Sequence, residues 1–190
     1  MTKEDLKIFQ KMPTLYTERL ILRKININDL DDIYEYASDA SVSKYLLWNP
    51  HPNKYYTNQY LKLILSKYKK CEFFDWGIEY KEKMIGTCGF TLFDLENNSA
   101  EIGYVLNSNY WHRGIAAEAS KKVLNFGFNV LKLNRIEAKY MSENIESRKV
   151  SEKIGMEFEG EHKKAIYAKN RYIDVSVSAI TADKYFNIDI

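Results

Sequence analysis

The sequence predicts an α/β fold, built as a mixed and mostly antiparallel twisted sheet of about seven strands with about four helices. Several short segments place apolar residues at every second position, which is typical of strands. Other segments space them by three and four, which is typical of helices that pack on a sheet. The chain has 190 residues, of which 45% are hydrophobic, enough for one core. We expect an N-terminal extension over residues 1–16 and a single domain over residues 17–190.

The first half of the chain predicts one strand, two helices and then three strands. Asn28 or Asp29 offers an N-cap for the first helix, and Pro50 and Pro52 interrupt regular structure before the second. Asn97, with the two residues after it, is a plausible turn between the last two strands, which makes an antiparallel meander. The elements predicted for this half cover residues 20–25, 29–37, 57–70, 73–80, 84–92 and 100–106.

The second half predicts a long helix, a strand, a short helix and a closing hairpin. The long helix, residues 114–131, carries an apolar stripe of Ala116, Ala119, Val123, Phe126 and Val130. A strand at 135–140 follows it. A helix capped by Asn144 then runs to Ile154, with Gly155 as its stop. Strands 158–168 and 172–180 form the hairpin, so the predicted order is βααβββαβαββ.

Composition excludes several classes of protein. The 28 Lys and Arg residues against 26 Asp and Glu give a net charge of +2, too balanced for a protein that binds nucleic-acid phosphates. No apolar run is long enough to span a membrane, and the first fifteen residues lack the apolar run of a signal peptide. Cys71 and Cys88 form neither a disulfide framework nor a metal-ligand pattern. We expect a cytoplasmic protein without a metal, as a monomer or a homodimer.

The polar segment from Asn107 to Ala117 leads from a predicted strand into the start of the long helix. The first N–H groups of a helix lack internal partners, and the helix dipole is positive there, so the junction suits a pyrophosphate. Gly114 and Ala116 leave room for a phosphate to approach the backbone, and Arg113 adds a positive charge. An ordinary strand–loop–helix turn is an equally weighted interpretation of this loop alone. Neither a P-loop nor a dinucleotide-binding glycine pattern is present.

A set of short motifs along the chain resembles the GNAT superfamily of N-acetyltransferases, and within it the Rim-type enzymes that acetylate the N-termini of ribosomal proteins. The resemblance covers roughly residues 17–183, and the predicted order of elements agrees with it. It implies the GNAT fold and an enzyme that transfers the acetyl group of acetyl-CoA to a primary amine. The motifs are Thr17-Glu18-Arg19-Leu20-Ile21-Leu22-Arg23, Trp48-Asn49-Pro50, Ala100-Glu101-Ile102-Gly103-Tyr104, Trp111-His112-Arg113-Gly114-Ile115-Ala116-Ala117-Glu118-Ala119, Asn144-Ile145-Glu146-Ser147 and Glu152-Lys153-Ile154-Gly155-Met156.

The resemblance also implies where acetyl-CoA binds. The amides from Arg113 to Ala117 would hold the pyrophosphate, and the strand that ends at Leu106 would pair with the pantetheine arm. The branch usually has Gly where His112 stands, so we expect the His112 side chain to point away from the site. The cofactor-binding residues expected on this basis are Tyr104, Val105, Leu106, Trp111, His112, Arg113, Gly114, Ile115, Ala116, Ala117, Asn144 and Ser147.

Acetyl transfer to an amine needs a group that removes a proton from the amine, donors for the oxyanion and a proton for the thiolate. Glu101 is the candidate base, although an exposed strand Glu is the ordinary interpretation. The resemblance assigns Ser147 to the CoA sulfur, although a Ser in a first helical turn often only bonds backbone. The amide of Val105 is the expected oxyanion donor. Ile166 stands where some Rim-type enzymes carry a carboxylate base before Tyr167.

The acceptor is expected between the first two helices and the final hairpin, where Trp48, Tyr55 and Tyr167 are the candidate contacts. These segments are aromatic and carry few acids, which favours a protein or peptide N-terminal α-amine. A small amine, such as a polyamine, an amino acid or an aminoglycoside-type antibiotic, is the alternative. A third hypothesis is a domain that binds acetyl-CoA without catalysis.

Overall fold

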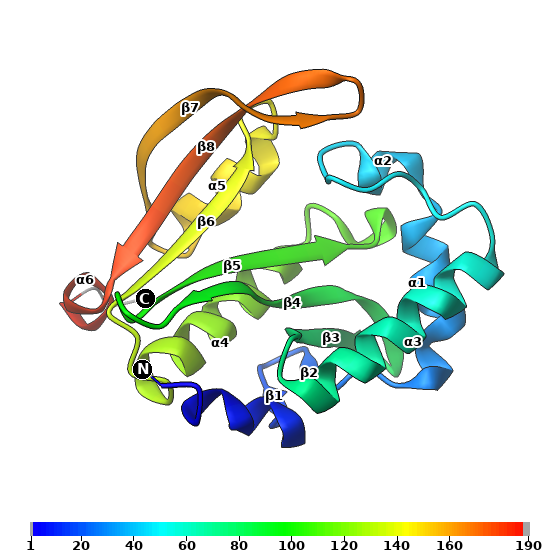
Figure 1. Cartoon of the computed structure of the whole chain (residues 1–190), viewed down its shortest axis with the longest axis horizontal. Coiled ribbons are helices and arrows are strands. Elements are labelled where there is room, and N and C mark those ends of the chain that lie inside the picture. Colours follow the sequence, from blue (N-terminus) through cyan, green and yellow to red (C-terminus); the bar gives the residue numbers. More distant parts are fainter. Residues whose placement is uncertain (1, 188–190) are drawn as a thin grey trace.

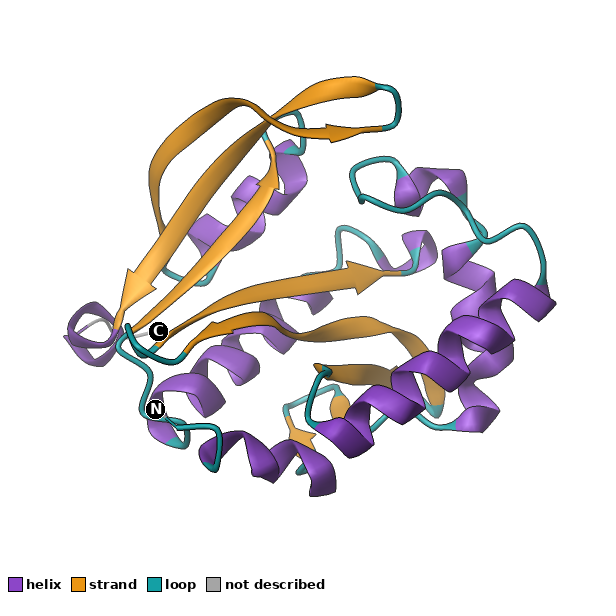
Figure 2. Ribbon diagram, in the orientation of Figure 1, coloured by secondary structure: helices purple, strands orange, loops and turns teal. Residues whose placement is uncertain are grey.

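The computed structural model describes residues 2–187, which form one mixed sheet of eight strands with helices on both of its faces (Figure 1, Figure 2). The strand order across the sheet is β1-β2-β3-β4-β5-β6-β8-β7. The strands are β1 (Leu15–Tyr16), β2 (Ile21–Arg23), β3 (Phe74–Tyr80), β4 (Lys83–Asp94), β5 (Ser99–Leu106), β6 (Arg135–Met141), β7 (Glu157–Ala168) and β8 (Arg171–Thr181). The helices are η1 (Asp5–Lys11), η2 (Ile27–Asp29), α1 (Leu30–Ala37), α2 (Ala40–Ser43), α3 (Lys54–Lys70), η3 (Ser108–Tyr110), α4 (Ile115–Asn129), α5 (Ile145–Lys153) and α6 (Ala182–Asn187).

The predicted mixed, mostly antiparallel sheet is confirmed, and each predicted strand and helix has a counterpart. Within residues 2–187 the structure adds the two-residue strand β1, the four-residue helix α2, the six-residue helix α6 and the short helices η1, η2 and η3. Strand β1 and helices α2 and α6 are too short to show a periodicity in the sequence. Helix α3 begins three residues before its predicted start, because the Asn53 side chain accepts a hydrogen bond from the amide of Tyr56 at 2.9 Å.

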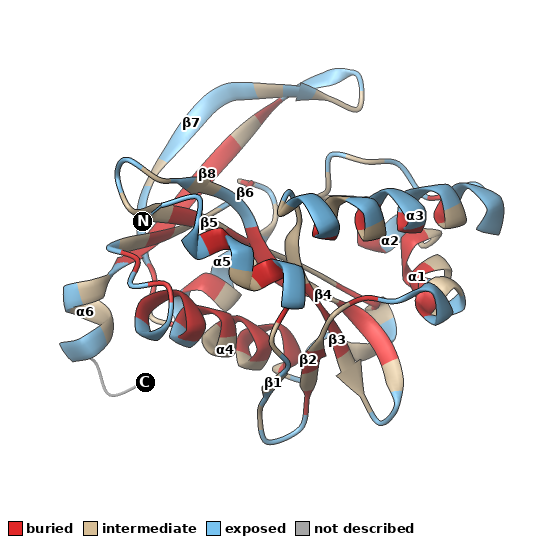
Figure 3. Ribbon diagram, turned by 60° about the horizontal axis from the view of Figure 1, so that its bottom comes forward, coloured by how far each residue is buried: buried red, intermediate tan, exposed pale blue. Residues whose placement is uncertain are grey.

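The two faces of the sheet carry different helices. On one face Trp76 lies edge-on to Phe126 of α4, with ring centroids 5.3 Å apart, and Cys88 contacts Ser120 of the same helix. Helix α5 lies on this side, against β6 and the final hairpin. Helices α1 and α3 cover part of the opposite face, at the end of the sheet where β5 finishes (Figure 1). Ten of the fifteen residues of α4 are buried, and the helix is mostly red in Figure 3.

The N-terminal segment packs against the core. Phe9 of η1 is fully buried, and strand β1 pairs with β2. The division into an extension at residues 1–16 and a domain from residue 17 stays a prediction. Five aromatic rings lie with their centroids within 6.5 Å of that of Phe9, namely those of Phe74, Trp76, Phe90, Phe93 and Phe126.

Strands β5 and β6 separate soon after they meet, and this divergence positions the site. Their parallel pairing covers three residue pairs and ends at Glu101 and Glu137. Beyond that point β5 continues beside β4, while β6 continues beside β8. A wedge therefore opens between the two central strands, visible in Figure 1 where the green β5 leaves the yellow β6.

Across residues 2–187, none of the helices combines the length and the apolar composition that crossing a bilayer requires.

Candidate active site

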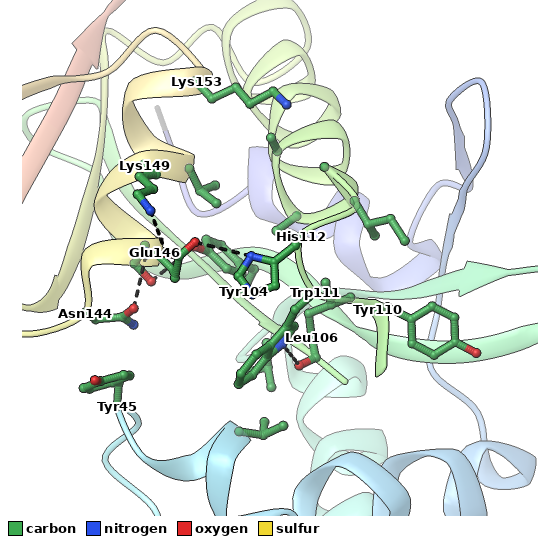
Figure 4. Close-up of a pocket in the computed structure, with 18 of the residues that line it drawn as sticks. Tyr45, Tyr104, Leu106, Tyr110, Trp111, His112, Asn144, Glu146, Lys149 and Lys153 are labelled. Atoms are coloured by element: carbon green, nitrogen blue, oxygen red, sulfur yellow. Dashed lines mark hydrogen bonds and ion pairs between the residues drawn. The ribbon is translucent and has the colours of Figure 1, made fainter. Parts of the chain in front are cut away.

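A cavity of about 250 Å³ lies at the open end of the wedge (Figure 4). Its walls come from the last three residues of β5, the loop before α4, the first turn of α4, the exposed side of α5 and the short helix α2. The loop of residues 107–114 and the start of α4 therefore meet the Asn144 helix in space, as the motif order implies. Of the twelve expected cofactor residues, the lining includes all but Arg113.

Strand β5 turns unpaired amides toward the wedge. The amide of Asn107 donates to the carbonyl of Ile85 at 2.8 Å. Gly86 and Leu106 are therefore a non-hydrogen-bonded pair of the antiparallel ladder, and the Leu106 amide points away from β4. Alternation then directs the amides of Tyr104 and Leu106 into the wedge. The amide of Val105 points to β4, where Thr87 lies opposite it. The Val105 amide, expected as the oxyanion donor, therefore faces β4, and the amides of its two neighbours face the wedge.

Trp111 ties the loop to the strand. Its indole Nε1 donates to the carbonyl of Leu106 at 2.8 Å, which satisfies one backbone acceptor at the wedge. Arg113 behaves differently from the expectation that its charge faces a phosphate. Its guanidinium lies 5.3 Å from the ring centroid of Tyr110, which explains why the side chain is not part of the cavity wall.

The first turn of α4 presents its free amides to the cavity. Gly114 is the N-cap, with φ of 74°, and no side chain caps the helix. Ile115, Ala116 and Ala117 follow it on the cavity wall with small or buried side chains. The positive charge here comes from Lys153 of α5, whose Nζ would lie 3.5 Å from a Cβ atom added to Gly114. The sequence does not identify Lys153 as a cation of this site, because the i,i+4 spacing of Lys149 and Lys153 is equally typical of a solvated helix face.

An ion pair between Arg19 of the N-terminal motif and Glu118 of α4 stabilises the start of this helix. The Arg19 Nε donates to Glu118 at 2.7 Å, and the Thr17 hydroxyl donates to the same carboxylate at 2.5 Å. Arg19 also reaches the carbonyl of Arg113 at 3.1 Å. Burial alone would raise the pKa of Glu118, but the hydrogen bonds from Thr17 and Arg19 hold it below its usual value. Residues 17–19 thus fix the start of α4 without entering the cavity.

His112 adopts a left-handed backbone conformation, with φ of 59°. Glycine adopts this conformation at lower cost, which accounts for the Gly expected at this position. The side chain is exposed, yet it does not point away from the site as predicted. Its Nδ1 lies 3.7 Å from the carboxylate of Glu146 at the mouth of the cavity, and Glu146 in turn pairs with Lys149 at 2.8 Å (Figure 4).

Tyr104 and Ser147 meet across the wedge. The Tyr104 hydroxyl donates to the Ser147 hydroxyl at 3.1 Å, so β5 and α5 touch where the strands have already separated. Asn144 caps α5 by accepting a hydrogen bond from the Ser147 amide at 3.2 Å. Burial raises the pKa of Tyr104 to about 12. Tyr104 therefore acts as a hydrogen-bond donor that orients Ser147 and not as a source of protons.

Glu101 lies where the wedge begins and does not line the cavity. Its carboxylate accepts a hydrogen bond from Thr91 at 2.9 Å and pairs with Lys139 at 3.1 Å. Alternation places it on the same face of β5 as Gly103 and Val105, opposite to Tyr104. Glu101 is thus close to the wedge on the side of the sheet that carries α1 and α3.

The three residues expected to contact the acceptor lie outside the cavity wall. Trp48 is half-buried beside His51, whereas Tyr55 and Tyr167 are exposed on α3 and on the hairpin. The wall on this side is formed instead by Ser41 and Val42 of α2 and by Tyr45 and Leu46, which follow α2. The hairpin still reaches α2, because its turn residue Lys169 donates to the carbonyls of Ser43 and Lys44. The hairpin and the α2 segment therefore meet, whereas the three expected contacts do not line the cavity.

Asp75 of β3 is a carboxylate that no sequence motif indicates. Neither of its oxygens accepts a hydrogen bond from any residue in the range 2–187, and its Oδ1 is buried. Gly89 lies opposite it on β4, and a Cβ atom there would come within 2.6 Å of this oxygen. Burial raises the pKa of Asp75 to about 7. A single Asp in an otherwise apolar strand does not change the period of the pattern, so the pattern does not indicate a functional carboxylate there.

Unpaired backbone amides on one strand, a helix N-terminus and a flanking lysine together describe a site for a ligand with an extended amide-bearing arm and a phosphate group. A hydroxyl pair and a carboxylate stand where that arm would end. Such a site defines an acyl-transfer enzyme that uses a phosphate-containing carrier.

Comparison with known proteins identifies the family. Residues 19–157 match the family model described as Acetyltransferase (GNAT) domain, and the chain belongs to this family. It is 39% identical over 176 residues to the uncharacterized N-acetyltransferase p20 of Bacillus licheniformis, covering 92% of this chain and 99% of that protein. The chain is an N-acetyltransferase of the GNAT family.

Solved structures agree. A GNAT-family acetyltransferase from Bacillus anthracis superposes with a TM-score of 0.81 at 31% identity, over 90% of this chain and 99% of that one. RimL, a ribosomal L7/L12 α-N-protein acetyltransferase solved with coenzyme A, superposes with a TM-score of 0.80 at 19% identity, over 90% of this chain and 99% of that one. At that identity RimL shows the shared fold alone.

Substituting Gly114 by Val tests the anion site. A branched side chain in the left-handed conformation costs about 1–2 kcal/mol, and it would occupy the space beside the helix start, where Lys153 Nζ lies 3.5 Å from the added Cβ atom. We expect the dissociation constant of acetyl-CoA, measured by calorimetry, to rise at least about tenfold. The matched control is Gly160→Val, because a Cβ atom at Gly160 meets nothing within 4 Å. Unchanged affinity in Gly114→Val would show that the helix start does not hold the cofactor.

Replacing Asp75 by Asn tests the buried carboxyl. Since the folded pKa is raised to about 7 from 3.8, the folded state holds a proton that the unfolded state has lost between these values. The Asp75 contribution to stability therefore falls as the pH rises from 4 to 7, and Asn lacks this loss. At about 1.4 kcal/mol per pKa unit, the upper limit of this loss in the free energy of unfolding is about 4 kcal/mol. Partial solvent contact of Asp75 reduces the expected loss to about 1–2 kcal/mol.

The measurement is chemical denaturation of both proteins at several pH values. Asp75→Asn should be the more stable protein at pH 8, and its advantage should shrink toward pH 4. A constant difference across this range would mean that Asp75 has an ordinary pKa.

Proposed function

We propose that this N-acetyltransferase uses acetyl-CoA as the donor and a primary amine as the acceptor. The observation that carries the proposal is the wedge between β5 and β6, which opens directly onto the N-terminus of α4. The pantetheine arm carries two amide groups, and these would pair with the outward amides and carbonyl of β5 as an added strand. The pyrophosphate would then lie at the first turn of α4, beside Lys153.

The acetyl group would lie in the wedge near Tyr104 and Leu106. Nitrogen of the acceptor attacks the thioester carbonyl, so a C–N bond forms while negative charge develops on the carbonyl oxygen. The outward amide of Tyr104 is suited to donate to that oxygen, because it is fixed before the reaction begins, and the Leu106 amide is left for the pantetheine arm. Collapse of the tetrahedral intermediate then breaks the C–S bond and releases the thiolate of CoA.

Ser147 is proposed to receive this thiolate. Its hydroxyl is oriented by Tyr104 and lies in the first turn of α5, whose N-terminal dipole stabilises a nearby anion. The Ser147 hydroxyl donates to the sulfur, and a proton from solvent completes the thiol. A thiol has an ordinary pKa of about 8.5, so it needs stabilisation more than a strong acid.

Glu101 is proposed to remove the proton from the attacking amine through a water molecule. It lies on the α1 and α3 side of β5, where an acceptor approaches the wedge from the face opposite to α4. Its ion pair with Lys139 and the hydrogen bond from Thr91 fix the orientation of the carboxylate. Because Glu101 does not line the cavity, proton transfer through water is favoured over direct contact with the amine.

The proposed acceptor is the α-amine of a protein or peptide. The rim of the acceptor side exposes aromatic side chains, among them Tyr55 and Tyr167, which suit contact with a polypeptide. RimL, with the same fold, carries this activity in its name. A small amine is the second candidate, and the unpaired Asp75 carboxylate favours it. An α-amine has a pKa of about 7.7–8.0 and therefore needs little help from a base.

Glu101→Gln is expected to lower the acetylation rate by about ten- to a hundredfold below the pKa of the amine, because a charged amine then needs the base. The effect should shrink at high pH, where the amine is already neutral, and acetyl-CoA affinity should not change. The pH–rate profile with one peptide acceptor is the measurement. Glu137→Gln is the control, since Glu137 also pairs with Lys139. A profile equal to that of the wild type would remove Glu101 from the mechanism.

The acceptor class can be decided by following thiol release from acetyl-CoA. Peptides with Ala, Ser or Met at the N-terminus should give the highest kcat/KM, above those of spermidine and an aminoglycoside. Blocking the peptide N-terminus should abolish the reaction. Release with none of these amines would instead indicate a domain that binds acetyl-CoA without catalysis.

A further inference from the structure

Solvent reaches a strip of the sheet on the face where α1 and α3 lie. The strip is formed by side chains and glycines of three adjacent strands, and its members are all partly exposed although their neighbours in sequence are mostly buried. It continues the wedge onto the acceptor face. We call it the acceptor strip, and it consists of Asp75, Thr87, Glu101, Gly103 and Val105.

Of the two carboxylates on the acceptor strip, only Glu101 has partners among residues 2–187. Glu101 is paired with Lys139 and bonded by Thr91. Asp75 has neither a hydrogen-bond donor nor a cation beside it among residues 2–187, and one of its oxygens is fully buried. An unpaired carboxylate in such a place is costly, so its retention calls for a ligand that compensates it.

The surroundings of Asp75 suit a cation. Tyr68 of α3 donates its hydroxyl to the Asp75 carbonyl at 2.6 Å, which places an aromatic ring beside the residue. Burial chiefly raises the pKa of Tyr36 on α1 and of Tyr60 on α3, and the Asp75 charge adds to the rise in both, so these two side chains lie near Asp75. A carboxylate with tyrosine side chains around it suits an alkylammonium group.

Register fixes the distance from Asp75 to the reacting centre. Asp75 pairs with Gly89 on β4, and Gly89 pairs with Gly103 on β5, so the three lie in one row across the sheet. Neighbouring strands lie about 4.8 Å apart, which puts Asp75 about 10 Å from Gly103. No side chain of Gly89 or Gly103 stands between them. The carboxylate is therefore too far away to take the proton of an amine that attacks in the wedge, but it is within reach of a second charged group.

We propose that Asp75 determines acceptor specificity by binding a second positive charge of the acceptor, separated from the reacting nitrogen by about five carbon atoms. The acceptor class is a primary amine that carries another ammonium group, either a diamine or a peptide with a cationic side chain near its N-terminus. This inference rests on the proposed function, since it assigns a role to the acceptor side of the same site.

The test compares acceptors that differ only in the second charge. With the wild-type enzyme, 1,5-diaminopentane should have a kcat/KM at least about tenfold above that of pentylamine, mainly through a lower KM. Asp75→Asn should bring the diamine to the level of pentylamine and leave pentylamine itself unchanged. The peptides Ala-Lys-Ala and Ala-norleucine-Ala distinguish the two sources of the charge, because only the source that fits should lose rate in the variant.

Glu96→Gln serves as the control, because Glu96 is an exposed carboxylate in the turn between β4 and β5, away from the strip. Acetyl-CoA affinity and the melting temperature of each variant are measured in parallel, so that a folding defect is recognised. Equal rates for the charged and neutral member of both acceptor pairs in the wild type would overturn the proposal, whether or not the variant folds. Absence of thiol release with every amine would instead overturn the proposed function.

Discussion

The separation of β5 from β6 is the constraint on which the rest of the site depends. Two parallel strands that stay paired would satisfy each other's backbone groups and leave nothing for a ligand. Here the pairing stops after three residue pairs, although β6 stays paired with β8 on its other edge along its full length. The β5 amides that face the gap then lack a protein partner. Everything else at the site, from the Trp111 bond to the Tyr104 and Ser147 contact, borders this gap.

The position of α4 follows from the same geometry. The loop that leaves β5 is anchored at Leu106 by Trp111, and the start of α4 is held by Arg19 and Glu118. The contact between Arg19 and Glu118 connects residues 99 positions apart, so the first strand motif and the first helical turn of the site depend on one another. The N-terminal motif has a structural role here, because its side chains support the site without lining it.

Much of the fold was predictable from sequence, because periodicity and capping are local properties. The α4 stripe and the Asn144 cap are examples, and the loop that runs into α4 was singled out for the same reason. Lys153, Asp75 and the direction of the Val105 amide were not predictable, because each depends on register or on contact between distant elements. Lys153 reaches the α4 start only because α5 packs beside α4, and the amide direction is set by the Asn107 bond to Ile85.

Phe9 shows how the order of synthesis matters for this chain. Its ring emerges from the ribosome before those of its partners, which lie on β3, β4 and α4, up to Phe126. The chain must be translated as far as Phe126 before this aromatic cluster can close. Until then the segment that holds Phe9 exposes an apolar side chain to chaperones or to other nascent chains. Phe9 is thus synthesised before its partners but protected only after them, and its burial reports that the core has formed.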